Sequence, residues 1–273
     1  MIRDINNRDA AFQKLQVLKT NRNKRHRYGQ FLVEGVRNIN KPAANGWEIA
    51  SFVYPRDREL SDWAKGMLRD VRTQENLRLG PGLMEELSGK EDTSELMAVV
   101  NMRSGGAGEF RLPENPLLVL FDRPSNRGNL GTLLRSCDGL GADGLILTGH
   151  GVDLYDPEVV TASMGSFFRV QAAQMELRDV TAYIEELRER YPGFRTVGTT
   201  AHRQRAVWGE DLSGPVLLML GNETEGLSYG FKQSCDVLCT IPMAEEGSAS
   251  SFNVACAGTV LMYEAVRQRA ERG

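Results

Sequence analysis

The second half of the chain holds three polar segments whose residues could position a ligand and stabilise charge during a reaction. They are residues 122–135, 220–227 and 241–254. Glycines at 128 and 131 in the first segment let the backbone approach a ligand closely. The candidate side chains supply amides, a guanidinium, a carboxylate and a hydroxyl: Asn129, Arg135, Glu223, Ser251 and Asn253. A packed core would not accept these groups, so we expect a ligand site.

Several other chemistries are not expected. His26, His150 and His202 show no arrangement with Asp and Ser or Cys that would indicate a hydrolytic triad. Cys235 and Cys239 have no matching Cys or His pair to complete a zinc site, so no metal is expected. The G-x-G-x-x-G fingerprint is also missing after the first apolar run of this half, which argues against NAD or FAD binding.

Continuous apolar runs surround the three segments and indicate strands buried on both faces of a parallel sheet. Helical patterns separate these runs at 129–140, 178–190 and 251–269. Ligands of such sheets collect at the carboxyl ends of the strands, where the three polar segments begin. The expected strands are 117–121, 145–147, 196–199, 216–220 and 237–241.

The first hundred residues predict a smaller α/β unit. A helix is expected over 8–20, followed by a charged turn at 22–27. Further strands are expected at 31–33, 49–54 and 96–102, and further helices at 35–45, 58–69 and 82–88. The glycines and prolines of 103–116 indicate an interdomain linker without regular structure. We therefore expect domains at 1–102 and 116–273, joined by a linker over 103–115.

Charge is unevenly distributed along the chain. Residues 1–30 carry eight Lys and Arg against two Asp, whereas the rest carries 25 basic and 34 acidic residues. A local excess of this kind suits contact with nucleic-acid phosphates, and a solvated helix face explains it equally well. No long apolar stretch or secretory signal is present in the sequence, so a cytoplasmic protein is expected. The candidate RNA-binding residues are Lys19, Arg22, Lys24, Arg25 and Arg27.

The three polar segments, in this order, resemble the motifs of the SpoU/TrmH branch of the SPOUT methyltransferases. The matching patterns are N-x-G-x-x-x-R over 129–135, G-N-E-x-x-G-L over 221–227, and I-P-M at 241 followed by S-x-N-V at 251. The segment SMGSFFR at 163–169 is similar to another stretch of that family. FLVEGVR at 31–37 resembles the substrate-binding domain of its ribosomal-RNA members.

This resemblance implies a particular fold and reaction. The C-terminal α/β domain would form a deep trefoil knot and bind S-adenosylmethionine in a bent shape. The enzyme would be a homodimer whose active site borrows residues from both chains. It would methylate a ribose 2′-hydroxyl of RNA, and the N-terminal likeness favours 23S ribosomal RNA over transfer RNA.

The resemblance also implies residue roles. Backbone groups of Gly221, Ile241 and Phe252 would contact the cofactor, although the family commonly has Leu at position 252. Asn129, Arg135, Glu223, Ser251 and Asn253 match the catalytic set. A guanidinium holds its proton too firmly to act as a base. Arg135 is therefore expected to fix the target phosphate and stabilise the developing alkoxide, while Glu223, Ser251 and Asn253 orient the ribose and the loops.

Structural alternatives remain for these residues. Asn129 or Ser251 could be helix caps, and Glu223 could sit in a turn. Arg135, on an apolar helix, is expected to need a partner. At the level of the whole protein, the alternatives are a non-catalytic protein that binds RNA or docks on the ribosome, a transfer-RNA 2′-O-methyltransferase, and a nucleotide-binding enzyme of unrelated chemistry.

Overall fold

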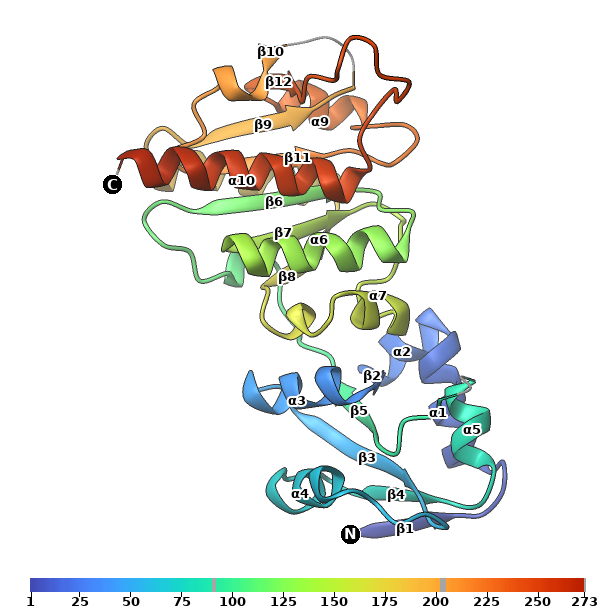
Figure 1. The fold of residues 1–273 in the computed structure, drawn as a ribbon. Helices are drawn as coiled ribbons and strands as arrows, with labels where there is room; N and C mark the ends of the chain where they lie inside the picture. Colours follow the sequence, from blue (N-terminus) through green and yellow to red (C-terminus); the bar gives the residue numbers. More distant parts are fainter. Residues whose placement is uncertain (90–91, 202–204, 273) are drawn as a thin grey trace. The chain divides into compact units, whose positions relative to one another are not determined.

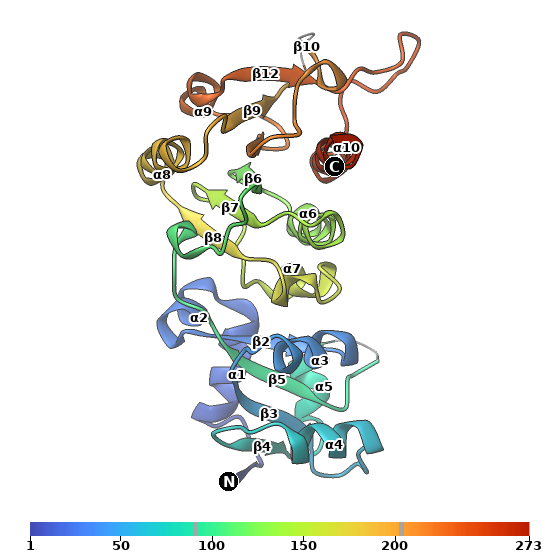
Figure 2. The same cartoon turned by 90° about the vertical axis from the view of Figure 1, so that its left-hand side faces the viewer.

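The computed structural model describes residues 1–89, 92–201 and 205–272. Its contacts divide the chain into two compact units (Figures 1 and 2). The first consists of Met1–Ser104 with Asp153–Arg169, and the second of Gly105–Val152 with Val170–Gly273. The chain therefore passes between the units at three points.

The first unit is built on a mixed sheet with the strand order β1-β4-β3-β5-β2 among the described residues. β3 and β1 run parallel to β4, whereas β5 runs antiparallel to β3 and β2. The strands expected near 31, 49 and 96 are confirmed, and the short polar strands β1 and β4 were not predicted. The strands are β1 (Ile2–Ile5), β2 (Gln30–Glu34), β3 (Ile49–Pro55), β4 (Asn76–Leu79) and β5 (Met97–Asn101).

Helices α1 and α5 pack their apolar residues against this sheet in one buried cluster. The Asp9 side chain caps α1 by accepting hydrogen bonds from two backbone N–H groups of its first turn. The basic run after α1 is helix α2, which corrects the expected turn, because Asn21 caps its start and Gly29 ends it in the left-handed region at φ 61°. The helices are α1 (Ala10–Thr20), α2 (Arg22–Tyr28), α3 (Val36–Ala44), α4 (Asp62–Asp70) and α5 (Leu83–Ser88).

Residues Asp153–Arg169, which form α7 (Pro157–Ala162) and the short helix η2 (Ser166–Phe168), cluster with the first unit. Their aromatic side chains account for this. The Phe31 ring centroid lies 5.1 Å from that of Tyr155 and 5.5 Å from that of Phe167. Trp47 Nε1 donates to the Phe168 carbonyl at 2.8 Å. The contiguous domains expected from the sequence do not include this excursion of the chain.

The second unit contains a sheet with the strand order β10-β12-β9-β11-β6-β7-β8 among its described residues. Every neighbouring pair is parallel, which confirms the predicted parallel-sheet α/β class. The strands β8 and β10 were not predicted, because neither contains a continuous run of large apolar residues. The strands are β6 (Leu117–Asp122), β7 (Gly144–Thr148), β8 (Ala172–Met175), β9 (Arg195–Thr199), β10 (Arg205–Ala206), β11 (Val216–Leu220) and β12 (Val237–Thr240).

Helices cover both faces of this sheet. α6 and α10 lie together on one face, and α8 and α9 lie on the other (Figures 1 and 2). The predicted linker is partly folded, since η1 (Ala107–Glu109) places the buried Ala107 in the core of this unit. The remaining elements are α6 (Arg127–Leu140), α8 (Leu177–Arg190), η3 (Val207–Gly209), α9 (Tyr229–Ser234) and α10 (Val254–Arg272).

None of the helices in the described ranges combines the length and the apolar character that a membrane crossing needs.

Candidate active site

The carboxyl edge of the parallel sheet brings the three polar segments together. β6 and β11 are adjacent, and the last pair in their register joins Phe121 to Leu220. The loops that follow them, 123–126 and 221–227, therefore start side by side. The long loop after β12 returns to this edge before α10 begins at Val254. The position fits the rule that parallel sheets bind ligands at the carboxyl ends of their strands.

The Glu223 carboxylate accepts hydrogen bonds on both oxygens and ties two of these loops together. Oε2 accepts from the backbone N–H of Ser125 at 2.9 Å and from its hydroxyl at 2.6 Å. Oε1 accepts from the Asn126 N–H at 3.0 Å and from Asn129 Nδ2 at 3.1 Å. Glu223 lies in the turn between Asn222 and Gly226, as the structural alternative expected, and its carboxylate also holds the loop after β6 in place.

The amide of Asn129 extends this network to the third segment. Its Oδ1 accepts from Asn253 Nδ2 at 2.9 Å. Asn253 Oδ1 in turn accepts backbone N–H groups in the first turn of α10, so Asn253 caps that helix and Ser251 does not. Asn129 is not a cap either, because the Asn126 side chain caps α6. Glu223, Asn129 and Asn253 thus form a continuous chain of hydrogen bonds across the three segments.

The electrostatic state of Glu223 follows from these contacts. Burial raises the pKa of its carboxyl, but the hydrogen bonds from Ser125 and Asn129 outweigh this effect and hold the pKa below its usual value. The carboxylate is therefore ionised at neutral pH, which suits an acceptor that holds donors in place. It does not suit a general acid.

The loop after β11 requires glycine at position 221. A Cβ added there would overlap the backbone of Gly226 and Leu227. Asn222 holds the loop in place, since its Oδ1 accepts from the Thr224 N–H at 2.9 Å and its Nδ2 donates to the Arg123 carbonyl at 2.8 Å. The backbone of this loop is thus closely packed and fixed in position.

A cavity of about 320 Å³ opens beside this loop, within the second unit. Gly221, Ile241 and Phe252, the predicted cofactor contacts, all line it, as do Glu223 and Ser251. Its walls combine apolar side chains with a few polar groups, as is common in small-molecule sites.

Arg135 does not line the cavity of its own chain. Its side chain is exposed on α6. The expectation that its guanidinium needs a partner stays a prediction. Ser251 and Phe252 are also exposed, in the loop before α10.

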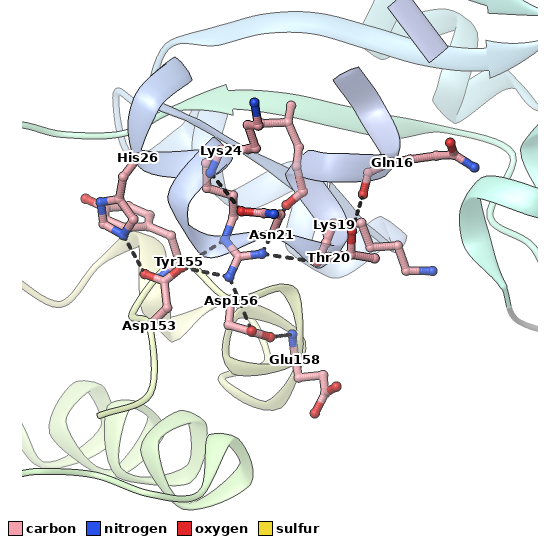
Figure 3. A network of polar contacts seen from close by, with 12 residues as sticks. Gln16, Lys19, Thr20, Asn21, Lys24, His26, Asp153, Tyr155, Asp156 and Glu158 are labelled. Atoms are coloured by element: carbon pink, nitrogen blue, oxygen red, sulfur yellow. Dashed lines mark hydrogen bonds and ion pairs between the residues drawn. The ribbon is translucent and has the colours of Figure 1, made fainter. Parts of the chain in front are cut away.

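Arg25, predicted to bind RNA, is instead buried in the first unit with 2% of its surface exposed. Its guanidinium donates to Asp153 at 2.8 Å, to Asp156 at 3.3 Å and to two carbonyls of α1. His26 Nε2 lies 2.9 Å from the second oxygen of Asp153 (Figure 3). The guanidinium has no donor left for phosphate, so we correct this assignment: Arg25 anchors the 153–169 excursion to α2.

The other predicted RNA-binding residues differ in their contacts and in their exposure. Lys19 Nζ donates to the carbonyls of Leu87 and Ser88 and so stabilises the C-terminal end of α5. Arg27 is exposed, and Arg22 and Lys24 are half-buried on α2.

Sequence reasoning missed Ser125 and Asn126, although both hold Glu223. The motif spacing points to Asn129 alone, and small polar residues before a helix look like ordinary cap and turn formers. Among the described residues no cluster of His, Cys, Asp and Glu could hold a metal ion. His202 lies outside the described residues.

The comparisons with known proteins cover both units. The family described as "SpoU rRNA Methylase family" matches residues 116–263, and the "SpoU L30e-like domain" matches residues 9–98. The chain belongs to the SpoU rRNA methylase family. The resemblance inferred from the three motifs is therefore confirmed, and the alternative of an unrelated nucleotide-binding enzyme is wrong.

Individual members of the SpoU family match over nearly the whole chain. A 23S rRNA (uridine(2479)-2′-O)-methyltransferase of Streptomyces viridochromogenes is 45% identical, over 98% of this chain and 93% of its own length. The crystal structure of the SpoU methyltransferase AviRb from the same species, in complex with AdoMet, is similar at 44% identity and a TM-score of 0.91, covering 96% of this chain and 99% of that chain. An AdoMet-bound rRNA methyltransferase from Sinorhizobium meliloti is 26% identical, with a TM-score of 0.83 and coverage of 97% and 98%.

Proposed function

We propose that this protein transfers a methyl group from S-adenosylmethionine to a ribose 2′-hydroxyl of 23S ribosomal RNA. The observation that carries the proposal is the chain of hydrogen bonds from Glu223 through Asn129 to Asn253, which lies beside a cavity of ligand size. The printed activity of the S. viridochromogenes relative and the AdoMet bound by two structural neighbours support it.

The residues present fit the cofactor. Gly221 lets the backbone of Gly226 and Leu227 pack directly against it, which sets the position of the loop that lines the cavity. Ile241 and Phe252 line the same cavity and offer backbone polar groups together with apolar surface. When bound there, S-adenosylmethionine supplies an electrophilic methyl group on a sulfonium.

The protein contributes mainly positioning to this reaction. Methyl transfer needs the acceptor oxygen in line with the bond that breaks, and holding that geometry supplies much of the rate enhancement. The ionised Glu223 fixes Asn129, and Asn129 fixes Asn253 at the start of α10. Ser251, two residues earlier, is then held next to the cavity, where its hydroxyl can orient the ribose.

We further propose a homodimer. An apolar groove of about 390 Å³ lies between α6 and α10, and the exposed side chains of Val260 and Tyr263 line it. A second copy of the chain would cover this surface. Arg135, exposed on α6 and outside the cavity of its own chain, would then serve the site of the partner by fixing the target phosphate and stabilising the alkoxide.

The N-terminal domain, 1–102, is proposed to bind the RNA, with 103–115 as linker and 116–273 as the methyltransferase domain. Arg22, Lys24 and Arg27 on α2 carry positive charge that suits phosphate contacts. The excursion of residues 153–169 into the first unit gives the two units two further covalent connections besides the linker.

A thermal-shift experiment with S-adenosylmethionine, S-adenosylhomocysteine and NAD tests the cofactor assignment, because a ligand that binds only the folded state raises the melting temperature. Both sulfur compounds should stabilise the protein and NAD should not. Stabilisation by neither sulfur compound would favour the non-catalytic, ribosome-docking alternative. Comparison of 2′-O-methylation in 23S and transfer RNA separates the two enzymatic alternatives.

A further inference from the structure

A second cavity, of about 470 Å³, adjoins the proposed cofactor cavity. Asn222 and Glu225 line both cavities. Ser125, which lines the second, donates to Glu223, which lines the first. The loop after β11 therefore forms a common wall, and a group bound in one cavity lies next to a group bound in the other.

The lining of the second cavity is rigid. The Val152 N–H donates to the Pro124 carbonyl at 2.8 Å, which joins the loops after β6 and β7. The contact is so close that a Cβ at Gly151 would lie 2.5 Å from that same carbonyl oxygen. Arg123 is held in the left-handed region at φ 51°, and its carbonyl accepts from Asn222. Sites with fixed linings bind ligands at a lower entropic cost.

The groups that line this cavity suit an anionic ligand rich in acceptors. The Arg123 guanidinium is paired with Asp122 and Glu225, so its charge is largely compensated. Arg127 and His150 are exposed and line the cavity, where Arg127 offers guanidinium donors and His150 offers ring nitrogens for hydrogen bonds. Pro124 and Val152 add an apolar surface. A nucleotide presents the matching features, since it carries a phosphate, a polar base edge and an apolar base face.

We propose that this second cavity holds the target nucleotide of the RNA. His150 contacts the edge of the base, Arg127 contacts a neighbouring phosphate, and Pro124 and Val152 pack against the base face. The assignment rests on the proposed function and adds the site that recognises the acceptor. The shared wall supports it, because the acceptor ribose must lie within reach of the methyl group bound next door.

The test uses the full-length protein with unmodified 23S rRNA transcript and radiolabelled S-adenosylmethionine. His150→Ala and Arg127→Ala should each raise the KM for RNA about tenfold. Cofactor affinity, measured by calorimetry, should stay within about twofold, since neither side chain lines the first cavity. Both side chains are exposed, so their removal should leave folding intact.

Salt dependence separates the two contacts. Arg127→Ala should reduce the slope of log KM against log salt by about 1, whereas His150→Ala should leave the slope unchanged. Arg190→Ala, which removes an exposed arginine at the C-terminal end of α8, is the matched control and should change the KM less than about twofold.

Wild-type KM values in both variants would overturn the inference, as would an equal loss in the control. Loss of cofactor binding in either variant would also overturn it, since the cavity would then serve the cofactor. A wild-type protein that binds no S-adenosylmethionine and methylates no RNA would instead overturn the proposed function itself.

Discussion

Glu223→Gln tests the hydrogen bonds that Glu223 accepts at the centre of the site. The substitution keeps the shape of the side chain but leaves one accepting oxygen instead of two. The carboxylate faces donors on both oxygens, two from Ser125 on one side and the Asn126 N–H with Asn129 Nδ2 on the other. A glutamine amide places an N–H₂ group against one of these pairs. Asn129 cannot turn to accept without losing its contact with Asn253, so the amide nitrogen should face Ser125.

The expected cost follows from the donor that is left. The Ser125 hydroxyl can rotate and accept from the glutamine, but the Ser125 backbone N–H cannot. This N–H lies in an exposed hydrogen bond and can turn to water, so its lost bond and the loss of charge assistance together should cost about 1 kcal/mol of folding free energy. For a domain of this size that corresponds to a fall of about 2–4 °C in melting temperature.

The assays are thermal unfolding and methyl transfer to 23S rRNA, with Glu185→Gln on the exposed face of α8 as the control that should change neither. The Glu223→Gln variant should also lose turnover about tenfold or more, because Asn129 and the start of α10 lose their fixed positions. A melting temperature within 1 °C of wild type together with normal turnover would show that the Glu223 carboxylate does not hold Asn129 and the loop after β6 in place.

The same variant predicts a pH effect. The pKa of Glu223 is lowered in the folded protein, so its ionised form stabilises the fold above the pKa of the unfolded chain. This stabilisation is lost as the pH falls through the folded-state pKa. The difference in melting temperature between wild type and Glu223→Gln should therefore narrow on acidification, and a constant difference from neutral to acidic pH would contradict the assignment.

Three further perturbations test other parts of the account. Arg25→Ala should destabilise the first unit by about 3–5 kcal/mol in denaturant titrations, because it leaves Asp153 buried without its arginine partner. An Arg25→Ala/Asp153→Ala double variant should recover part of this loss of stability. Equal stability of Arg25→Ala and wild type would contradict the prediction. Gly221→Ala should abolish S-adenosylmethionine binding in calorimetry while the fold is retained, since a Cβ displaces the loop after β11. Wild-type affinity would show that the position of this loop does not determine cofactor binding. Arg135→Lys should lose most turnover but keep cofactor binding, and mixing it with Asn129→Ala subunits should restore activity if Arg135 acts across a dimer; no restoration would place Arg135 in the site of its own chain.

The parallel sheet was predictable because its strands are continuous apolar runs, such as Leu117–Asp122 and Val216–Leu220. Strands with polar or very short sequences, such as β1 and β10, lack that signal and depend on their neighbours in the sheet. The basic run after α1 was mistaken for a turn because its charges obscure a helix that Asn21 and Gly29 delimit.

Within the site, motif order identified Asn129, Glu223 and Asn253, and the structure adds how they contact one another. No sequence pattern indicates that Arg25 is buried, because its partners Asp153 and Asp156 lie more than 120 residues away along the chain. The same limit applies to Arg135, whose exposure depends on packing between helices. The trefoil knot implied by the family likeness stays a prediction.

The most direct test of the central claim is a map of 2′-O-methylated nucleotides in unmodified 23S rRNA transcript incubated with the protein and S-adenosylmethionine. We predict a new ribose methylation that appears with the wild-type protein and is lost with Asn129→Ala, while that variant still binds the cofactor. Methylation on a base, or a ribose methylation that persists in Asn129→Ala, would contradict it.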